Sequence, residues 1–339
     1  MKSVAFIYWG PHEAHAAWAK SITNDFYPFI PSSIFKKFFN PEDTFTDFFK
    51  KTFVHQPLSI INSINIPKVD IYLIEGMGCI LPALLKKKKD SRIILINDDT
   101  FFYDYKKSSP SAKAVYNKLI KKVNGIISTS KYVNDLIPPW IAVPKKIVPL
   151  YADTKKFSKV SINLTQKTIG FVGRLGYKKG IDILIDVYEK IRKNDPNYKL
   201  YLVGNIYDSS IRNKFKKTRA KEDIILTNWV DNPEAYLPKI GTYINPARHE
   251  PFGVGVIEAM CAGMPPIVTN KCGTAEFVAK ISKKLIASPE VEDIVEKFYW
   301  LNEDQKRKKR LGLLCKKEAT KFTRERSIED FRKAFKEIT

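Results

Sequence analysis

Short strands that are apolar on both faces, separated by helices, place the strongest limit on the fold of this chain. In the first half, strands are expected at 4–9, 71–74, 92–96, 125–128 and 146–150. Helices are expected between them, at 12–22, 78–88, 111–123 and 131–136. Strands without a polar face are buried on both sides, as in parallel sheets that are covered by helices. The pattern therefore predicts an α/β fold for this half.

The second half repeats this pattern after a polar segment at 151–167. Strands are expected at 168–173, 199–203, 224–226, 243–244 and 266–269, and helices at 181–194, 209–220, 233–240 and 254–262. A chain of 339 residues is long enough for two such domains. We therefore expect two α/β domains with a boundary near residues 155 and 156, and a ligand site in the cleft between them.

The cysteines, the apolar stretches and the charge limit the class of protein. The four cysteines show no metal-binding spacing, so we expect free thiols in a reducing compartment such as the cytoplasm. Met1 leads directly into the first strand, which predicts no secretory signal. The longest apolar stretch, 69–85, is interrupted by Asp70 and Glu75, so no membrane span is expected. The formal charge of +22 favours a polyanionic partner, either nucleic acid, an anionic bilayer surface or a phosphorylated substrate.

The stretch 242–276 carries two carboxylates around the expected start of a helix. Glu250 lies in the loop and Glu258 on an early turn, with Gly253 between them. Amides at a helix start bind phosphate, and carboxylates accept hydrogen bonds from sugar hydroxyls. This arrangement suits a sugar diphosphate. An ordinary αβ crossover whose acids are solvated is the alternative at this point.

The loop 173–180 follows an expected strand and opens a helix. Its Arg174 and Lys179 can converge on a diphosphate, Arg174 as a planar fork and Lys179 as a point charge. They would stabilise the charge of a departing nucleotide without a metal. Such a pair of basic residues usually lies in a solvated turn. Next to Glu250 and Glu258, however, a diphosphate-binding role is favoured.

The first half offers weaker candidates. Gly10 follows the first strand at its carboxyl end, where open α/β sheets bind ligands, although a simple turn explains it equally well. Asn97 and Asp98 close the third strand and should point into the cleft, as a base or as ligands of substrate hydroxyls, unless they cap the next turn. His12 and His15 share one helix face, for which packing or surface roles are favoured over a metal pair or a base.

The segment 26–53 departs from the strand and helix pattern because it is rich in phenylalanine with paired lysines. An aromatic amphipathic segment with basic flanks can lie in a bilayer interface or form a groove for a lipid acceptor. The same phenylalanines can instead form the core under a helical hairpin. The basic run 86–89 can add attraction to anionic lipid, or can be a solvated helix end.

Several short motifs are specific in their order and spacing: KIVPLYAD at 146–153, VGRL at 172–175, KG at 179–180, LVG at 202–204, EPFG at 250–253, IEAM at 257–260 and GTAE at 273–276. Together they resemble the retaining glycosyltransferases of the GT-B fold, the family-four, glycogen-synthase-like group. The match is dense from residue 126 to 276 and thin before it. The resemblance implies two Rossmann-like domains that face a cleft, with domains at 1–155 and 156–325 and a last helix at 326–339 that returns to the first domain.

The resemblance also implies roles for residues. Arg174 and Lys179 are expected to bind the donor diphosphate, Glu250 the donor sugar and Glu258 the ribose. Further donor contacts are expected from the amides of Phe252, Gly253 and Val254, from the backbone of Trp229 and Val230 at the nucleobase, and from Gly10 near the phosphate. The candidate catalytic residues are Glu250, Arg174, Lys179, Asn97 and Asp98.

Two departures from the family concern the first domain. Pro11 replaces a customary second glycine after Gly10, and Asn97 stands where many members have histidine. Either Asn97 with Asp98 takes over the function of that histidine, or the acceptor geometry differs.

The resulting prediction is a cytoplasmic, peripherally membrane-associated hexosyltransferase that uses a nucleoside diphosphate sugar, such as a UDP- or GDP-sugar, with retention and without metal or other cofactor. The expected acceptor is a sugar, a glycan or a lipid-linked molecule, an anionic membrane surface is a further candidate partner, and no nucleic acid partner is expected. The alternatives are a nucleic-acid-binding protein, which the charge suggests, and a sugar-nucleotide binder without catalysis.

Overall fold

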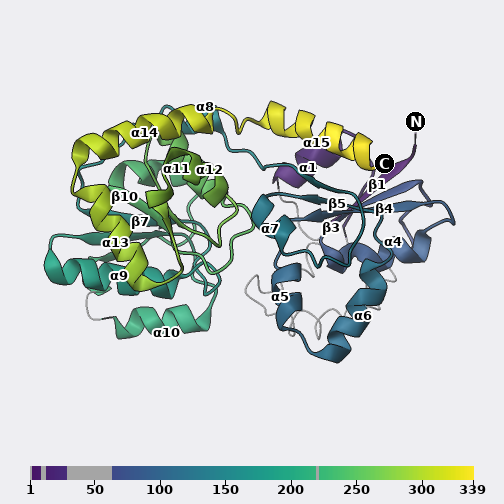
Figure 1. The fold of residues 1–339 in the computed structure, drawn as a ribbon, viewed down its shortest axis with the longest axis horizontal. Coiled ribbons are helices and arrows are strands. Elements are labelled where there is room, and N and C mark those ends of the chain that lie inside the picture. Colours follow the sequence, from purple (N-terminus) through teal and green to yellow (C-terminus); the bar gives the residue numbers. More distant parts are fainter. Residues whose placement is uncertain (1, 9–12, 29–62, 219–220) are drawn as a thin grey trace. The chain divides into compact units, whose positions relative to one another are not determined.

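The structure, a computed structural model, describes residues 2–8, 13–28, 63–218 and 221–339. The chain divides into two compact units (Figure 1). The first unit consists of Met1–Leu150 with Arg324–Thr339, and the second of Tyr151–Thr323. The boundaries expected from the sequence were at 155/156 and 325/326.

The first unit contains a six-stranded parallel sheet. Its strands, in spatial order, are β2 (Phe26–Pro28), β1 (Val4–Tyr8), β3 (Ile71–Glu75), β4 (Arg92–Asn97), β5 (Gly125–Ser128) and β6 (Lys145–Ile147). The short helices after the strands are α1 (Glu13–Lys20), η1 (Met77–Cys79), α4 (Ile80–Lys86), α5 (Phe101–Lys107), α6 (Pro110–Ile120) and α7 (Lys131–Asp135). The central strands are apolar on both faces because helices cover both.

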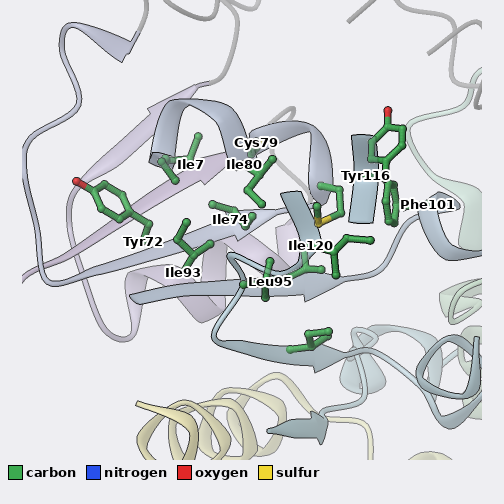
Figure 2. Packing of buried hydrophobic residues seen from close by; sticks show 14 of the residues in the cluster. Ile7, Tyr72, Ile74, Cys79, Ile80, Ile93, Leu95, Phe101, Tyr116 and Ile120 are labelled. Atoms are coloured by element: carbon green, nitrogen blue, oxygen red, sulfur yellow. The ribbon is translucent and has the colours of Figure 1, made fainter. Parts of the chain in front are cut away.

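The core of the first unit forms between the sheet and its helices. Figure 2 shows Ile74 and Leu95 on adjacent strands, next to Ile80 of α4 and Ile120 of α6. These side chains are at most 2% exposed. Burial of branched side chains on this scale is the main source of stability for such a unit.

The last helix, α15 (Arg324–Ile338), packs on the first unit although it follows the second in sequence. Its Phe331 ring stacks on Trp18 of α1, with centroids 5.1 Å apart. Ser327 Oγ accepts a hydrogen bond from the Trp18 indole and donates one to the Pro149 carbonyl oxygen. The return of the last helix to the first unit, expected from the family, is therefore observed.

The second unit also contains a six-stranded parallel sheet. Its strands, in spatial order, are β12 (Ile286–Ala287), β11 (Ile267–Thr269), β10 (Thr242–Asn245), β7 (Thr168–Val172), β8 (Lys199–Val203) and β9 (Ile224–Leu226). Its helices are α8 (Thr154–Phe157), α9 (Ile181–Asn194), α10 (Ser209–Lys217), η2 (Lys221–Asp223), η3 (Pro233–Lys239), α11 (Val254–Ala262), α12 (Ala275–Ile281), η4 (Lys283–Leu285), α13 (Val291–Asn302) and α14 (Gln305–Ala319).

Some elements differ from the expectation. The segment 151–167 contains α8, and the expected helix at 233–240 is a 3-10 helix with Pro238 inside it. The strands β2 and β12 and the helices α5, α12, α13 and α14 were not expected. The phenylalanine-rich segment lies outside the described residues, apart from Phe26 and its neighbours in β2. No helix in the described part of the chain is both long and apolar enough to cross a bilayer.

Candidate functional site

Glu250 and Gly253 lie in the loop that leads from β10 into α11. Gly253 has a φ of 96°, a left-handed conformation that favours glycine. A Cβ at this position would lie 2.9 Å from Cys272 Sγ and 3.2 Å from Cγ of Glu250, so a side chain does not fit. The amides of Val254 and Gly255 open α11 at the positive end of its dipole, whereas the Val256 amide already donates to the Gly253 carbonyl oxygen at 3.0 Å. The loop therefore presents a carboxylate beside an anion-binding helix start.

Lys179 and Glu250 form an ion pair between two loops that are far apart in the sequence. Nζ of Lys179 lies 2.6 Å from Oε2 of Glu250, and the side chains are 16% and 14% exposed. Gly180 allows the loops to meet, since it has a φ of 70° and a Cβ there would lie 2.1 Å from the Pro246 carbonyl oxygen. The structure thus brings together one predicted cation and one predicted carboxylate.

Arg248 ties the same two loops together. Its guanidinium donates to both carboxylate oxygens of Asp182, at 2.6 and 2.7 Å, and to the Tyr177 carbonyl oxygen at 2.9 Å. It also lies over the Tyr177 ring, 3.9 Å from the centroid. The backbone amides of Arg248 and His249 both donate to the Lys178 carbonyl oxygen. These contacts fix the loop of Lys179 relative to the loop of Glu250.

Glu258 lies on the second turn of α11 and is partly buried. Burial raises its pKa to about 7, although nearby Lys156 lowers it. Burial raises the pKa of the Tyr243 phenol, and the charges of Glu258 and Glu250 raise it further. Lys156 itself pairs with Glu234 at 2.9 Å. Glu258 is therefore a carboxyl group whose charge changes near neutral pH.

The other predicted donor residues lie in the second unit. Arg174 follows β7 and its side chain is exposed. Trp229 and Val230 follow β9, and the Trp229 indole is 69% exposed. Phe252 is buried in front of α11, which begins at Val254. The Trp229 indole N–H donates to Asp231 Oδ1 at 3.1 Å, and its exposed ring and the exposed Arg174 side chain are accessible to a ligand.

Asn97 and Asp98 lie at the end of β4 in the first unit. Asn97 is 2% exposed, and its amide donates to Ser128 Oγ at 3.1 Å and to the Val133 carbonyl oxygen at 3.2 Å. These hydrogen bonds give Asn97 a structural role inside the unit. Asp98 is partly exposed and accepts a hydrogen bond from Thr129 Oγ1 at 2.6 Å.

His15 lies between two carboxylates at the same edge of the sheet. Its Nδ1 lies 2.6 Å from Oε1 of Glu75, and its Nε2 lies 3.2 Å from Oδ2 of Asp98. Burial lowers the pKa of His15, but hydrogen bonds to Asp98 and Glu75 outweigh it and raise the pKa to about 10. His15 is thus a buried imidazolium. Glu75 is not among the predicted site residues, and its only signal in the sequence is an acid at the end of an apolar strand.

Gly10 and His12 lie outside the described residues, so their predicted contacts are not placed. Within the described ranges, no group of three or more His, Cys, Asp or Glu side chains is arranged to hold a metal ion. The four cysteines are free thiols and all are buried.

Comparison with known sequences identifies the second unit. A sequence model of the family described as "Glycosyl transferases group 1" matches residues 152–317. The chain is 26% identical over 285 residues to the uncharacterized glycosyltransferase MJ1178 of Methanocaldococcus jannaschii, a match that covers 83% of this chain and 78% of that protein. It is 22% identical over 197 residues to the lipopolysaccharide core biosynthesis mannosyltransferase LpsB of Rhizobium meliloti, with 52% and 55% covered.

Solved structures share the fold of both units. Anabaena Alr3699/HepE in complex with UDP-glucose matches with a TM-score of 0.75 at 14% identity, over 99% of this chain and all of that one. TarM matches with a TM-score of 0.60 at 18% identity, over 78% of this chain but only 54% of TarM. Residues 152–317 are therefore similar to the group 1 glycosyltransferases, and the two parallel sheets with these structural matches show the GT-B fold.

Proposed function

We propose that this protein transfers a hexosyl unit from a nucleoside diphosphate sugar to an acceptor, with retention of the anomeric configuration. The observation that carries this proposal is the Lys179–Glu250 pair at the start of α11. It combines a cation and helix amides, which bind a diphosphate, with a carboxylate, which accepts hydrogen bonds from sugar hydroxyls. Retention and independence from metal rest on the resemblance to the family-four enzymes.

The donor is bound by the second unit. A diphosphate competes with Glu250 for Lys179, and the carboxylate oxygens of Glu250 then accept hydrogen bonds from the sugar. Arg174 provides the second cation, Glu258 binds the ribose hydroxyls, and the backbone at Trp229 and Val230 meets the base. Support for a nucleotide-sugar donor comes from HepE, whose structure contains UDP-glucose.

In the reaction, the bond between the anomeric carbon and the diphosphate oxygen breaks, and the acceptor oxygen bonds to the same face of that carbon. The proton of the acceptor hydroxyl passes to the departing diphosphate. Arg174, Lys179 and the first amides of α11 stabilise the negative charge that develops on the leaving group. Each such interaction contributes typically 10²- to 10³-fold in rate.

The acceptor is bound by the first unit and is a sugar, a glycan or a lipid-linked molecule. Asp98 accepts a hydrogen bond from its hydroxyl, and Thr129 and His15 hold Asp98 in place. A lipid-linked acceptor is supported by LpsB, which by its name acts on the lipopolysaccharide core. The enzyme would then work at a membrane surface from the cytoplasm.

Thermal unfolding with UDP-glucose, GDP-mannose and ADP-glucose tests the donor assignment. A bound donor stabilises the folded protein by roughly 2.7 kcal/mol at a hundred times its Kd. We expect one nucleotide to raise the Tm in the native protein but not in Lys179→Met. No stabilisation by any of these donors would contradict the proposal.

Release of the nucleoside diphosphate from the bound donor, followed with water as the acceptor, distinguishes an enzyme from a binder. Slow release that is lost in Lys179→Met supports catalysis. Tight binding without release, even after an acceptor panel, would leave only a sugar-nucleotide binder.

A further inference from the structure

Helix α14 has a charged side chain on its buried inner face and a large apolar side chain on its exposed outer face. Lys308 lies on the inner face with no exposed surface. Its Nζ donates to the Leu164 carbonyl oxygen at 2.8 Å, Thr242 Oγ1 at 3.0 Å and Asn302 Oδ1 at 2.6 Å. On the outer face, Leu313 is 70% exposed, as much as any large hydrophobic side chain in the described residues.

Basic side chains surround Leu313 on this outer face. At 100° per residue, Leu313 lies near the centre of an arc of about 120° that includes the flanking cations. The exposed cations of this arc are Lys306, Lys309, Arg310, Lys316 and Lys317. Leu314 lies 100° from Leu313 around the helix, outside the arc on the side of Arg310, and is 43% exposed. The only carboxylate within α14 is that of Glu318, which pairs with Lys321 and is 13% exposed.

The orientation of α14 is fixed by its packing on α11 (Figure 1). A Cβ at Gly312 would lie 2.2 Å from the Gly263 carbonyl oxygen, so only glycine allows this approach. The stem of Lys316 covers Gly263, where a Cβ would lie 2.8 Å from Cε. The helix therefore cannot turn to bury Leu313 without losing these contacts and those of Lys308.

We propose that the outer face of α14, formed by Lys306, Lys309, Arg310, Leu313, Leu314, Lys316 and Lys317, is a docking surface for an anionic lipid bilayer. The cations bind lipid phosphates, and the two leucines enter the headgroup region. Two copies of this face would repel each other, which disfavours a symmetric dimer formed through it. Nucleic acid would bind the cations but would make no use of an exposed leucine at their centre.

Lipid binding by this surface can be tested independently of catalysis, because the measurement is binding to vesicles and not enzyme activity. The probe is sedimentation with phosphatidylcholine vesicles, with and without phosphatidylglycerol. We expect binding only to the anionic vesicles, and binding that weakens as salt rises. Equal binding to both kinds of vesicle, or binding to neither, would overturn the proposal.

Paired variants separate this surface from the overall charge. Lys309→Gln with Arg310→Gln should lower the vesicle affinity roughly thirtyfold, as expected for two cations near the bilayer. Lys216→Gln with Lys217→Gln removes the same charge from exposed positions of α10 and should change it by less than about threefold. An equal loss in both pairs would show that only net charge matters.

Leu313 distinguishes a bilayer from nucleic acid. Leu313→Gln with Leu314→Gln should weaken vesicle binding roughly tenfold and leave any binding to duplex DNA unchanged. Since all four native thiols are buried, Leu313→Cys can be labelled selectively with an environment-sensitive dye. Its emission should rise with anionic vesicles, whereas the same dye at Lys193→Cys on α9 should not respond. A response to DNA alone would assign the face to nucleic acid and refute a bilayer partner.

Discussion

At the carboxyl edge of the first sheet, two carboxylates from β3 and the end of β4 surround one imidazolium, His15. At the carboxyl edge of the second sheet, Arg174 and Lys179 follow β7, and Lys179 pairs with Glu250 after β10. The first edge is rich in acceptors of hydrogen bonds, whereas the second combines cations with helix amides. An acceptor-rich edge suits neutral hydroxyls, and a cation-rich edge suits a diphosphate.

The two clusters also differ in how they are held. The Lys179–Glu250 pair joins two loops that Arg248 and Asp182 clamp from outside, so either partner can exchange for a ligand. The imidazolium of His15 is 4% exposed and is neutralised by Glu75 and Asp98 together. Under the proposed function, Lys179 acts directly on the donor, whereas His15 acts by holding Asp98.

The largest effect should follow from Lys179→Met. Loss of the cation removes stabilisation of the departing diphosphate, so donor turnover should fall about 10³-fold, or about 4 kcal/mol. The measurement is release of nucleoside diphosphate at saturating donor. Lys193→Met, which removes the same charge from the exposed end of α9, should retain full turnover. Similar turnover in the two variants would refute the role of Lys179.

His15→Gln should mainly affect the stability of the first unit. It leaves Glu75 and Asp98 without their cation, a loss of roughly 3 kcal/mol for a buried pair. Because the pKa of His15 is raised from 6.5 to about 10, its contribution is complete below 6.5 and is lost as the pH rises through 10. The deficit of the variant should therefore shrink as pH rises from neutral to 10, as measured by hydrogen exchange of the β3 and β4 amides.

A double variant sharpens the test of His15. Adding Asp98→Asn to His15→Gln removes one of the two stranded charges and should restore part of the stability. Donor binding should be unchanged in both variants, since the Lys179–Glu250 pair belongs to the other unit. An equally stable His15→Gln protein would contradict the view of His15 as a buried imidazolium.

The Lys179–Glu250 pair and the His15 cluster also differ in how far they could be predicted from the sequence. The strands β8 and β9 and the helices α9 and α11 begin and end where the periodic patterns predicted them. The approach of Lys179 to Glu250 was foreseeable because both loops follow parallel strands and carry recognisable motifs. The GT-B fold expected from these motifs is confirmed.

The His15 cluster could not be predicted in the same way. Glu75 and Asp98 meet His15 only because β3 and β4 are neighbours and α1 covers their ends, and strand order is set by tertiary packing. The shortest of the missed elements were missed for a related reason. β2 has three residues and α8 has four, too few for a periodic pattern. The reversed polarity of α14 likewise appears only when Lys308 is seen inside the unit.

Arg248→Lys tests whether the clamp on the two loops matters for the donor. Lysine keeps the charge but cannot form the fork to Asp182 or stack on Tyr177 in the same way. We expect donor KM to rise roughly tenfold, about 1.4 kcal/mol, with a smaller change in kcat. Arg192→Lys, which alters a similar pair with Asp223 on another face of α9, should leave KM unchanged. Equal KM values for Arg248→Lys and the native protein would show that the clamp only stabilises the fold.

Glu258→Gln should have the smallest effect, visible as a change with pH. Burial raises the pKa of Glu258 from 4.5 to about 7, so the folded state holds its proton more tightly than the unfolded state. Its contribution to stability is complete below pH 4.5 and is lost as the pH rises through 7. The free energy of unfolding of the native protein should therefore fall by about 1 kcal/mol per pH unit in this range, relative to that of Glu258→Gln.

The matched control for this dependence of stability on pH is Glu303→Gln, which removes an exposed carboxylate outside α11. Its unfolding curves should run parallel to those of the native protein at every pH. A carboxyl group whose pKa is raised by burial lowers the stability of the folded state near neutral pH. Such destabilising groups are typical of ligand-binding sites. If Glu258→Gln also ran parallel to the native protein, Glu258 would be an ordinary solvated carboxylate, and the ribose contact would lose its physical basis.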